Sequence, residues 1–414
     1  MTEWKTYKLG DVIDKIIDNR GKSAPISTEL YQPIIEINAI GDRTPNYELV
    51  RKWVSQHTYN TWFRSGHPIV GDILIPTVGT IGIASIMNEN RGCIAQNIIA
   101  LRTNDKVNNL FLYYFLRSDN IKQQLLNLNI GGVQPSIKVP HLLNLEIILP
   151  PLEEQRKIAG ILGAIDDKIE NNRRINANLE QQAQALYKQW FVDFEFPNKE
   201  GKPYKSSGGK MADSELGLIP EGWNAGKLEN MGSIVGGGTP SKAIAEYYTE
   251  NGIAWITPKD LSLTHSKFTS KGEIDITELG YNNSSTKIMP RGSVLFSSRA
   301  PIGYISIAKN EICTNQGFKS VIPNNGYTAF VYYYLLANTS NIEAQATGST
   351  FKEASGALMK SLDIVIPNNS LIEEFEGLMS PIFDKQEGLE EENTTLTTLR
   401  DTLLPKLMNG EIKM

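Results

Sequence analysis

Several short segments of this chain contain residue types used in phosphate and cofactor chemistry, but none has the spacing that this chemistry requires. Gly21-Lys22-Ser23 resembles the end of a phosphate-binding loop, yet Ile16 stands five positions before Gly21, where that loop needs a glycine. Gly236-Gly237-Gly238-Thr239 lacks the G-x-G-x-x-G spacing of a dinucleotide site. We predict that this second segment is a turn.

The chain also lacks the residues expected of a methyltransferase or a hydrolase. An enzyme that methylates an exocyclic amine holds the flipped base with an Asn/Asp-Pro-Pro-aromatic motif. The only Pro-Pro, in Leu149-Pro150-Pro151-Leu152, has no amide or carboxylate before it and no aromatic residue after it. No serine lies in a G-x-S-x-G elbow. We therefore expect no catalytic residues in this chain.

The elements that would position any functional residue are duplicated. The order of signals in residues 4–196 returns in residues 223–414. Matched segments include Trp4 with Trp223, Gly71-Asp72-Ile73-Leu74 with Gly292-Ser293-Val294-Leu295, Cys93 with Cys313, Gln96 with Gln316, and Leu145-Glu146-Ile147 with Leu362-Asp363-Ile364. This duplication predicts two similar modules and a target that has two parts.

The matched cysteines have two interpretations. Cys93 and Cys313 could form a disulfide or a metal pair, or each could be a small buried apolar residue inherited by duplication. We favour the second interpretation, and the four scattered histidines offer no zinc-ligand spacing. We expect no metal site.

Composition places the chain among soluble globular proteins. Its 414 residues suffice for two to four domains, and 40% are hydrophobic and 21% charged. No apolar run approaches the ~20 residues of a membrane span, and the N-terminus lacks a secretory signal. A cytoplasmic location is therefore expected.

The net charge of −5 is unevenly distributed. Residues 1–150 carry 15 basic and 13 acidic groups, whereas residues 368–414 carry 4 and 10. A neutral module can present a basic face, so the charge permits DNA binding without predicting it.

Each repeat begins with a module of about 150 residues that mixes strands with one helix. Short β-branched and aromatic runs predict strands, followed by a helical stretch at Asn109–Leu126 in the first copy and Ala329–Ala344 in the second. The predicted strands are Pro33–Ile37, Ile73–Pro76, Ile81–Met87, Ile98–Arg102, Ala254–Thr257, Val294–Ser297, Ile302–Ala308 and Lys319–Pro323. The pattern indicates an α+β domain with a mostly antiparallel or mixed sheet.

Each repeat ends in a long amphipathic helix with alternating steps of four and three residues. This spacing is typical of a coiled-coil seam. The predicted pairing residues are Ile158, Leu162, Ile165, Ile169, Asn176, Leu179 and Leu186 in the first helix and Ile382, Leu389, Asn393, Leu396 and Leu403 in the second. Two unrelated helices packed on their own domains are the alternative, but the matched Asn176 and Asn393 favour mutual pairing, because a seam asparagine commonly fixes register. Pro381 is expected to kink or divide the second helix.

These signals divide the chain into five segments. They are a first module at 1–150, a first helix at 151–196, a linker at 197–220, a second module at 221–367 and a second helix at 368–414. The linker is assigned from its content of Gly, Pro, Ser and Lys.

Several motifs resemble those of the specificity (S) subunits of type I restriction-modification systems. Leu149–Ala159 and Ile165–Glu170 are similar to the first central region of that family, and Leu399–Ile412 is similar to its usual ending. Gly292–Gly303 and Thr314–Lys319 match recurrent target-recognition patterns. The resemblance covers essentially the whole chain. The first module departs from the pattern, with Pro76–Thr80 where the second has Ser297–Pro301.

The resemblance implies a fold and a function. It implies two pseudo-two-fold-related α/β target recognition domains joined by two long antiparallel coiled-coil helices. The chain would be a non-catalytic subunit that binds double-stranded DNA, each domain reading one half of a bipartite asymmetric site. Its expected partners are two copies of the methyltransferase (M) subunit, docked on the helices, and restriction (R) subunits. S-adenosylmethionine, ATP and Mg are expected in those partners, and no cofactor in this chain.

Candidate DNA contacts are polar loop residues, since Arg, Lys, Asn and Gln read the edges of bases in the major groove. In the first module they are Arg20, Lys22, Thr77, Thr80, Gln96, Asn97, Gln134 and Lys138. In the second module they are Gly238, Thr239, Ser241, Ser297, Ser298, Arg299, Gln316, Lys319, Thr350 and Lys352.

Three other functions remain open at this point. The chain could be an orphan specificity protein without a restriction partner, or a coiled-coil scaffold whose end domains bind protein or sugar. A self-sufficient methyltransferase is disfavoured by the missing base-holding motif.

Overall fold

The computed structural model describes residues 4–128, 135–264, 266–299, 301–348 and 352–414. The chain divides into two compact units, one of Met1–Asn171 with Glu392–Met414 and one of Asn172–Glu391. Each unit contains one of the two modules and part of each long helix.

The first module is built on an antiparallel sheet of order β2-β8-β5-β6, whose strands are β2 (Ile13–Asp18), β8 (Ile98–Thr103), β5 (Ile73–Pro76) and β6 (Ser85–Ile86). A second sheet has the order β4-β3-β7, from β4 (Trp53–Val54), β3 (Gln32–Ile35) and β7 (Cys93–Ile94). In this second sheet β3 and β7 run parallel. β1 (Lys5–Lys8) pairs with β9 (Glu146–Leu149) and so joins the start of the module to its end.

The second module repeats this plan. Its larger sheet has the order β13-β21-β18-β19-β16, from β13 (Gly232–Gly236), β21 (Lys319–Pro323), β18 (Val294–Ser298), β19 (Ile302–Ala308) and β16 (Phe268–Thr269). The smaller pairs are β15 (Trp255–Ile256) with β20 (Cys313–Thr314), β12 (Asn224–Lys227) with β22 (Asp363–Ile366), and β14 (Tyr248–Thr249) with β17 (Asp275–Ile276). The first four strands of the larger sheet match those of the first module in order, which confirms the internal repeat.

Short helices cover and connect these sheets. They are α1 (Gln56–Thr61), α2 (Asn109–Arg117), α3 (Asp119–Asn127), α4 (Val139–Leu143), α6 (Pro258–Thr264), α7 (Glu278–Asn282), α8 (Thr328–Gln345) and α9 (Gly356–Ser361). Turns of 3₁₀ helix lie at η1 (Leu9–Val12), η2 (Ile37–Ala39), η3 (Tyr47–Leu49), η5 (Leu228–Asn230), η6 (Ala245–Tyr247) and η7 (Asn324–Gly326). The helical stretch predicted over Asn109–Leu126 is two helices, because Ser118 adopts an extended conformation and its hydroxyl bonds back to the carbonyl of Phe115.

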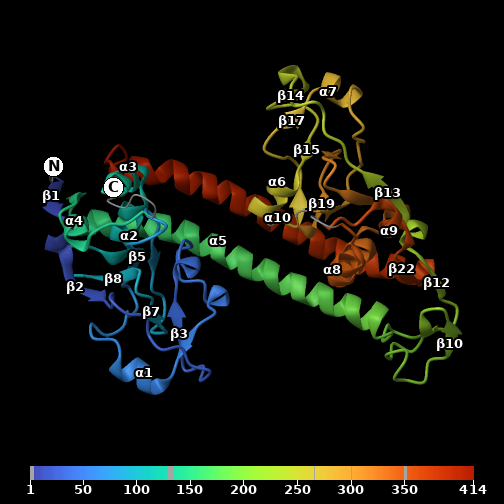
Figure 1. The fold of residues 1–414 in the computed structure, drawn as a ribbon, viewed down its shortest axis with the longest axis horizontal. Coiled ribbons are helices and arrows are strands. Elements are labelled where there is room, and N and C mark those ends of the chain that lie inside the picture. Colours follow the sequence, from blue (N-terminus) through green and yellow to red (C-terminus); the bar gives the residue numbers. More distant parts are fainter. Residues whose placement is uncertain (1–3, 129–134, 265, 300, 349–351) are drawn as a thin grey trace. The chain divides into compact units, whose positions relative to one another are not determined.

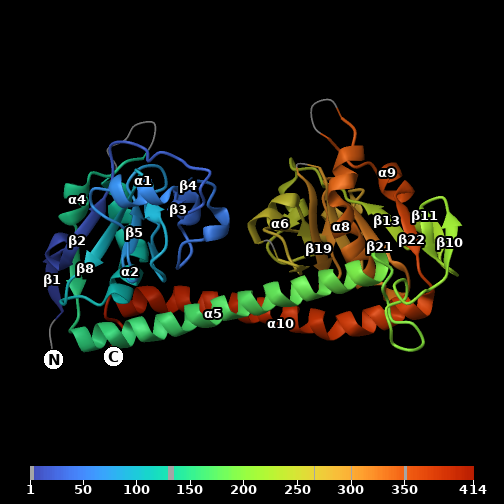
Figure 2. The ribbon, with the colours of Figure 1, turned by 90° about the horizontal axis from the view of Figure 1, so that it is seen from below.

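Two long helices follow the modules, α5 (Leu152–Tyr187), extended by the π-helical turn η4 (Lys188–Val192), and α10 (Asn369–Met408). They run side by side within each unit (Figures 1 and 2). In the first unit Ile158 and Leu162 of α5 share a core with Leu407 of α10. In the second, Ala183 shares a core with Phe375. The start of each helix therefore packs with the end of the other, as an antiparallel pair requires.

The predicted seam residues face inward. Ile158, Leu162, Ile169 and Leu389 are buried. The half-buried members are Ile165, Asn176, Leu179, Leu186, Ile382, Asn393, Leu396 and Leu403. The spacing in the sequence therefore identified the face of each helix that is withdrawn from solvent.

Pro381 does not divide α10, which is continuous from Asn369 to Met408. Pro381 removes the hydrogen bond to the carbonyl of residue 377, four positions earlier. Both Pro381 and Gly377 are exposed, so that carbonyl lies on the solvated side of the helix. The prediction that Pro381 divides the helix is wrong, and the exposed position of this carbonyl lets it bond to solvent in place of the missing amide.

The segment predicted as a linker is folded. β10 (Met211–Ser214) pairs with β11 (Gly217–Pro220) in a hairpin. Phe196 stacks on Tyr204 at 4.5 Å between ring centroids and on Trp223 at 5.0 Å. These aromatic contacts attach the segment to the core of the second unit, which the Gly- and Ser-rich composition did not indicate.

Candidate nucleic-acid interface

Each module has a cleft that is lined by the same four kinds of segment. They are the loop that follows β2 or β13, the strand β3 or β15, the loop that follows β5 or β18, and the loop that follows β7 or β20. The cleft of the first module has a volume of about 410 Å³ and that of the second about 1000 Å³. The repeat thus produces two equivalent sites of different size.

The first cleft brings together three of the predicted DNA contacts, Lys22, Gln96 and Asn97. Gln96 is exposed directly after β7, and Asn97 is half-buried beside it. The carbonyl of Asn97 accepts a hydrogen bond from the amide of Thr77 at 2.8 Å, which joins the loops that follow β5 and β7. The amide side chain of Asn97 therefore extends into the cleft from a backbone that a hydrogen bond holds in place.

The second cleft brings together Thr239, Arg299 and Gln316. The hydroxyl of Thr239 donates to Oε1 of Gln316, so the turn after β13 is bonded to the loop after β20. The indole of Trp255 in β15 donates to the carbonyl of Gly238 at 2.9 Å. These bonds fix the base of the cleft and leave Gln316 exposed at its rim.

The predicted turn at Gly236–Thr239 is a site of close packing within the protein. A Cβ added at Gly237 would lie 1.9 Å from the carbonyl oxygen of Asn315, and one at Gly238 would lie 2.5 Å from the amide nitrogen of Thr286. Glycine is needed here because the backbone of this turn contacts neighbouring backbone directly.

Three predicted contacts are fully buried. The hydroxyl of Thr77 donates to the carbonyl of Asn97 at 3.3 Å, that of Ser297 to Pro301 at 2.8 Å, and that of Ser298 to Gly317 at 3.1 Å. Such side chains hold the loops in place and are not available to a ligand. The expectation that Thr77, Ser297 and Ser298 touch DNA is corrected accordingly.

The remaining predicted contacts among the described residues lie outside the lining of the clefts. Arg20 forms a bidentate ion pair with Asp18, in which Nη2 lies 2.6 Å from Oδ2. The hydrogen bonds from Arg20 lower the pKa of the Asp18 carboxyl. Exposed positions are Thr80, Lys138, Ser241 and Lys352, and Lys319 is half-buried against Glu353. Gln134 and Thr350 lie outside the described residues.

The clefts also contain residues that the sequence did not single out. Lys242, Tyr248 and Lys259 line the second cleft, and Trp62 and Phe63 line the first. The sequence contained one usable signal, since Lys259 lies at the start of a short helix directly after a predicted strand. No comparable signal marked the aromatic residues.

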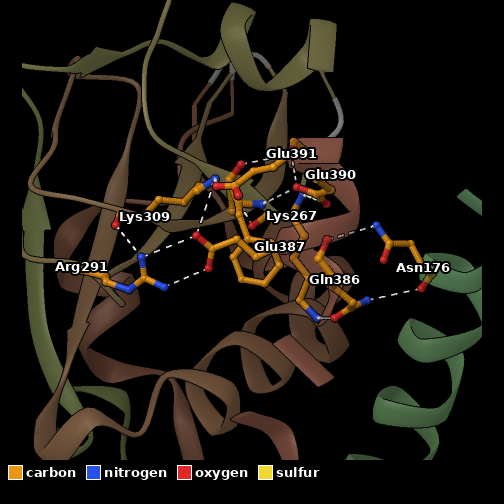
Figure 3. A network of polar contacts seen from close by, with 11 residues as sticks. Asn176, Lys267, Arg291, Lys309, Gln386, Glu387, Glu390 and Glu391 are labelled. Carbon is orange, nitrogen blue, oxygen red and sulfur yellow. Dashed lines mark hydrogen bonds and ion pairs between the residues drawn. The ribbon is translucent and has the colours of Figure 1, made fainter. Parts of the chain in front are cut away.

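In the second unit the module is fastened to the helix pair by a buried lysine, shown in Figure 3. Nζ of Lys267 lies 2.6 Å from Oε2 of Glu180 in α5 and 3.0 Å from Oε1 of Gln386 in α10. Its ammonium also lies 4.0 Å from the centroid of the Phe383 ring. Burial lowers the pKa of Lys267 to about 8, against the opposing effect of Glu180.

In the first unit a different set of residues attaches the module to the two long helices. The hydroxyl of Tyr114 in α2 donates to Oδ2 of Asp166 in α5 at 2.6 Å. Arg400 in α10 donates to Oδ1 of the same carboxylate at 2.9 Å. One module helix and both long helices therefore meet at a single buried carboxylate.

The described residues include no candidate metal site and no disulfide. No cluster of three His, Cys, Asp or Glu side chains among them is arranged to hold a metal ion. Cys93 and Cys313 are free and buried, and burial raises their pKa values to about 12 and about 11. Their interpretation as small core residues is therefore confirmed. None of the described helices has the length and apolar character needed to cross a membrane.

Two modules with equivalent clefts, each packed on a pair of long helices, are the features of one class of protein, the specificity subunits of type I restriction-modification systems. The chain matches the family model of the type I restriction modification DNA specificity domain over residues 1–181 and 220–374, and it belongs to that family. Specificity subunits of these systems are non-catalytic. The resemblance drawn from the helical motifs is thus confirmed.

Particular relatives extend this match. The chain is 37% identical over 190 residues to the type I restriction enzyme MjaIX specificity subunit of Methanocaldococcus jannaschii. These 190 residues are 45% of this chain and 44% of that subunit. It is 26% identical to the HindI specificity subunit of Haemophilus influenzae, with full coverage of both chains. A crystal structure of a type I restriction-modification S subunit from M. genitalium has a similar fold, with a TM-score of 0.60, 15% identity and coverage of 98% of this chain and 96% of that chain.

Proposed function

We propose that this chain reads a bipartite, asymmetric DNA site for a type I restriction-modification complex, each module binding one half. The observation that carries the proposal is that equivalent clefts present different side chains. Gln96 and Gln316 occupy the same position, but Val78 stands in the first cleft where Arg299 stands in the second. Two clefts that share a backbone arrangement but present different side chains suit two half-sites of different sequence.

The chemistry of each cleft supports base recognition. Gln and Asn side chains bond to the edge of adenine with two hydrogen bonds, and Arg does so with guanine. Gln96 with Asn97 in the first cleft, and Arg299 with Gln316 in the second, are therefore our proposed readers. Lys22 and Lys242 add positive charge for nearby phosphates, whereas Lys259 is paired with Glu273 of the same cleft.

The helices have the second role in this proposal. Their inner faces are occupied by the seam and parts of their sides by the modules, so the exposed faces that remain would dock two methyltransferase subunits. S-adenosylmethionine, ATP and Mg would act in the methyltransferase and restriction subunits, within the cytoplasm.

The proposal is tested by mapping methylated bases in a host that carries this chain with its methyltransferase partner. Arg299→Ala should relax recognition at one base position of one half-site and leave the other half unchanged. Lys287→Ala is the matched control, because it removes an exposed positive charge from the same module outside the cleft lining. Equal loss of methylation at all sequences would instead mark Arg299 as a phosphate contact. A scaffold for protein or sugar would give no sequence-selective methylation.

A further inference from the structure

Arg299 shares its counter-ion with a second cation. Nη1 of Arg299 lies 3.7 Å from Oε2 of Glu353, and Nζ of Lys319 lies 3.1 Å from Oε1 of the same carboxylate. Arg299 lines the second cleft, whereas Glu353 and Lys319 do not. The carboxylate therefore contacts a residue of the cleft without belonging to the cleft lining.

The backbone around Glu353 is fixed relative to Arg299. Glu353 exchanges two backbone hydrogen bonds with Thr347, at 2.8 and 3.3 Å. The next residue, Ala354, donates its amide to the carbonyl of Ser298 at 2.9 Å, one residue before Arg299. The backbone from which this carboxylate extends is thus held beside the end of β18.

The first module offers an internal comparison. There the amide of Ile137 donates to the carbonyl of Thr77 at 2.8 Å, as Ala354 does to Ser298. This match places Val78 at the position of Arg299 and Ser136 at that of Glu353, and Val78 and Ser136 form a backbone bridge. The strand register places buried Ile99 at the position of Lys319. The three charged residues of the second module, Arg299, Lys319 and Glu353, therefore all have neutral counterparts in the first module.

We infer that Glu353 is a positioning residue that holds Arg299 for recognition of one guanine in the half-site of the second module. The inference rests on the proposed function. A carboxylate that restrains a long side chain reduces the conformational entropy lost when it binds a base. At 3.7 Å the ion pair is longer than a hydrogen bond, so the donors of the guanidinium remain available to O6 and N7 of guanine.

The shared carboxylate has a second effect, on binding to DNA of any sequence. Two cations beside one carboxylate have a smaller attraction for phosphates than two free cations. Lys319 has only 18% of its side chain exposed, which keeps it beside Glu353 and away from solvent. Glu353 should therefore improve the ratio of specific to non-specific binding in both ways.

The experiment uses the full chain in complex with the methyltransferase subunit of its host. Binding to a randomised DNA pool gives the base preference at each position, and titration with salt on unrelated DNA gives the slope of log K against log salt concentration. The variants are Arg299→Ala, Glu353→Gln and Glu353→Asp. Glu311→Gln is the control, since it removes an exposed carboxylate from the same module outside the cleft lining.

Arg299→Ala should reduce the preference for guanine at one position by about 5- to 150-fold. Glu353→Gln should reduce the preference at the same position by a smaller factor and steepen the salt slope on unrelated DNA by about one. Glu353→Asp should restore part of the preference, and Glu311→Gln should leave the base profile unchanged.

Two results would overturn the inference in different ways. If Arg299→Ala relaxes one position while Glu353→Gln leaves that position and the salt slope unchanged, Glu353 has no positioning role and the proposed function stands. If Arg299→Ala changes no base preference at all, the role of Arg299 as a reader fails as well.

Discussion

Asn176 and Gln386 donate their side-chain amides to each other's main-chain carbonyls across the paired helices, at 3.4 and 3.3 Å. The sequence predicted that the seam asparagines Asn176 and Asn393, which occupy matching places in the two repeats, would fix the register with a partner. The partner of Asn176 is Gln386, whose Oε1 accepts a hydrogen bond from Lys267. The register of the helices and the attachment of the second module therefore depend on the same amide.

Removal of Lys267 should be costly for this reason. Lys267→Met leaves the carboxylate of Glu180, 23% exposed, without its cation, and we expect a loss of about 3–5 kcal/mol in the free energy of unfolding. Chemical denaturation of the variant measures this loss. The double variant Lys267→Met with Glu180→Gln should recover much of it, since no unpaired charge remains. The same substitution at Lys202, whose pair with Glu200 is exposed on both sides, should change stability little. Equal effects at both lysines would contradict the account of the buried attachment.

Glu376 should make stability depend on pH. Its carboxylate accepts the amides of Ala329 and Phe330 at the start of α8, and burial raises its pKa to about 7. The folded protein then binds a proton more readily than the unfolded chain, whose glutamates titrate near pH 4.3. The contribution of this group to stability is therefore present in full below about pH 4.3 and decreases as the pH rises to 7.

The measurement compares the wild type with Glu376→Gln in denaturation experiments at pH 5.5 and pH 7.5. The wild type should lose more stability than the variant between these two values, because the amide does not titrate. Parallel losses in both proteins would show that other groups account for the pH dependence.

Two adjacent glycines provide a test of the packing beneath the second cleft. Gly237→Ala places a Cβ 1.9 Å from a backbone oxygen, whereas the nearest atom to a Cβ at Gly236 is 3.9 Å away. Gly237→Ala should cost about 1–3 kcal/mol or more, as overpacking does. Gly236→Ala should be close to neutral in thermal unfolding. Similar melting temperatures for both variants would show that the turn adjusts without strain.

The proposed function makes the paired helices a ruler between the half-sites. One heptad inserted in each helix, after Asn171 and after Glu391, adds about 10.5 Å, since an α-helix rises 1.5 Å per residue. DNA rises 3.4 Å per base pair, so the gap in the methylated motif should widen by about three base pairs. Both half-sites should stay the same. A variant that methylates the original motif with its original gap would exclude this role for the helices.

The sequence predicted the frame of the molecule well because the frame depends on periodic patterns. Ile73–Pro76, Ile302–Ala308 and Lys319–Pro323 are strands with the predicted bounds. Only Ser85–Ile86 of the run Ile81–Met87 is a strand. β19, its counterpart, is longer because its pairing with β18 extends back to Ile302, and β16 adds a pair at Ala308.

The sequence predicted the reading residues less well, because their exposure depends on contacts between distant segments. Gln96 and Gln316 are exposed and line the clefts, whereas Ser297 and Ser298 are buried and bonded to Pro301 and Gly317. Polarity and position in a loop do not distinguish these cases. Glu353 was missed because no local pattern marks a carboxylate that lies beside a residue 54 positions earlier in the chain. Comparison of the two repeats, charged against neutral, is the signal that identifies it.

The central claim is that each module reads its own half-site, and one experiment tests it directly. Methylated bases are mapped across the genome of a host that carries this chain with its methyltransferase partner, as wild type, Gln96→Ala and Gln316→Ala. We expect a motif of two different halves with an unspecified gap, in which Gln96→Ala relaxes one half and Gln316→Ala the other. A single uninterrupted motif, or relaxation of the same half by both variants, would contradict the claim.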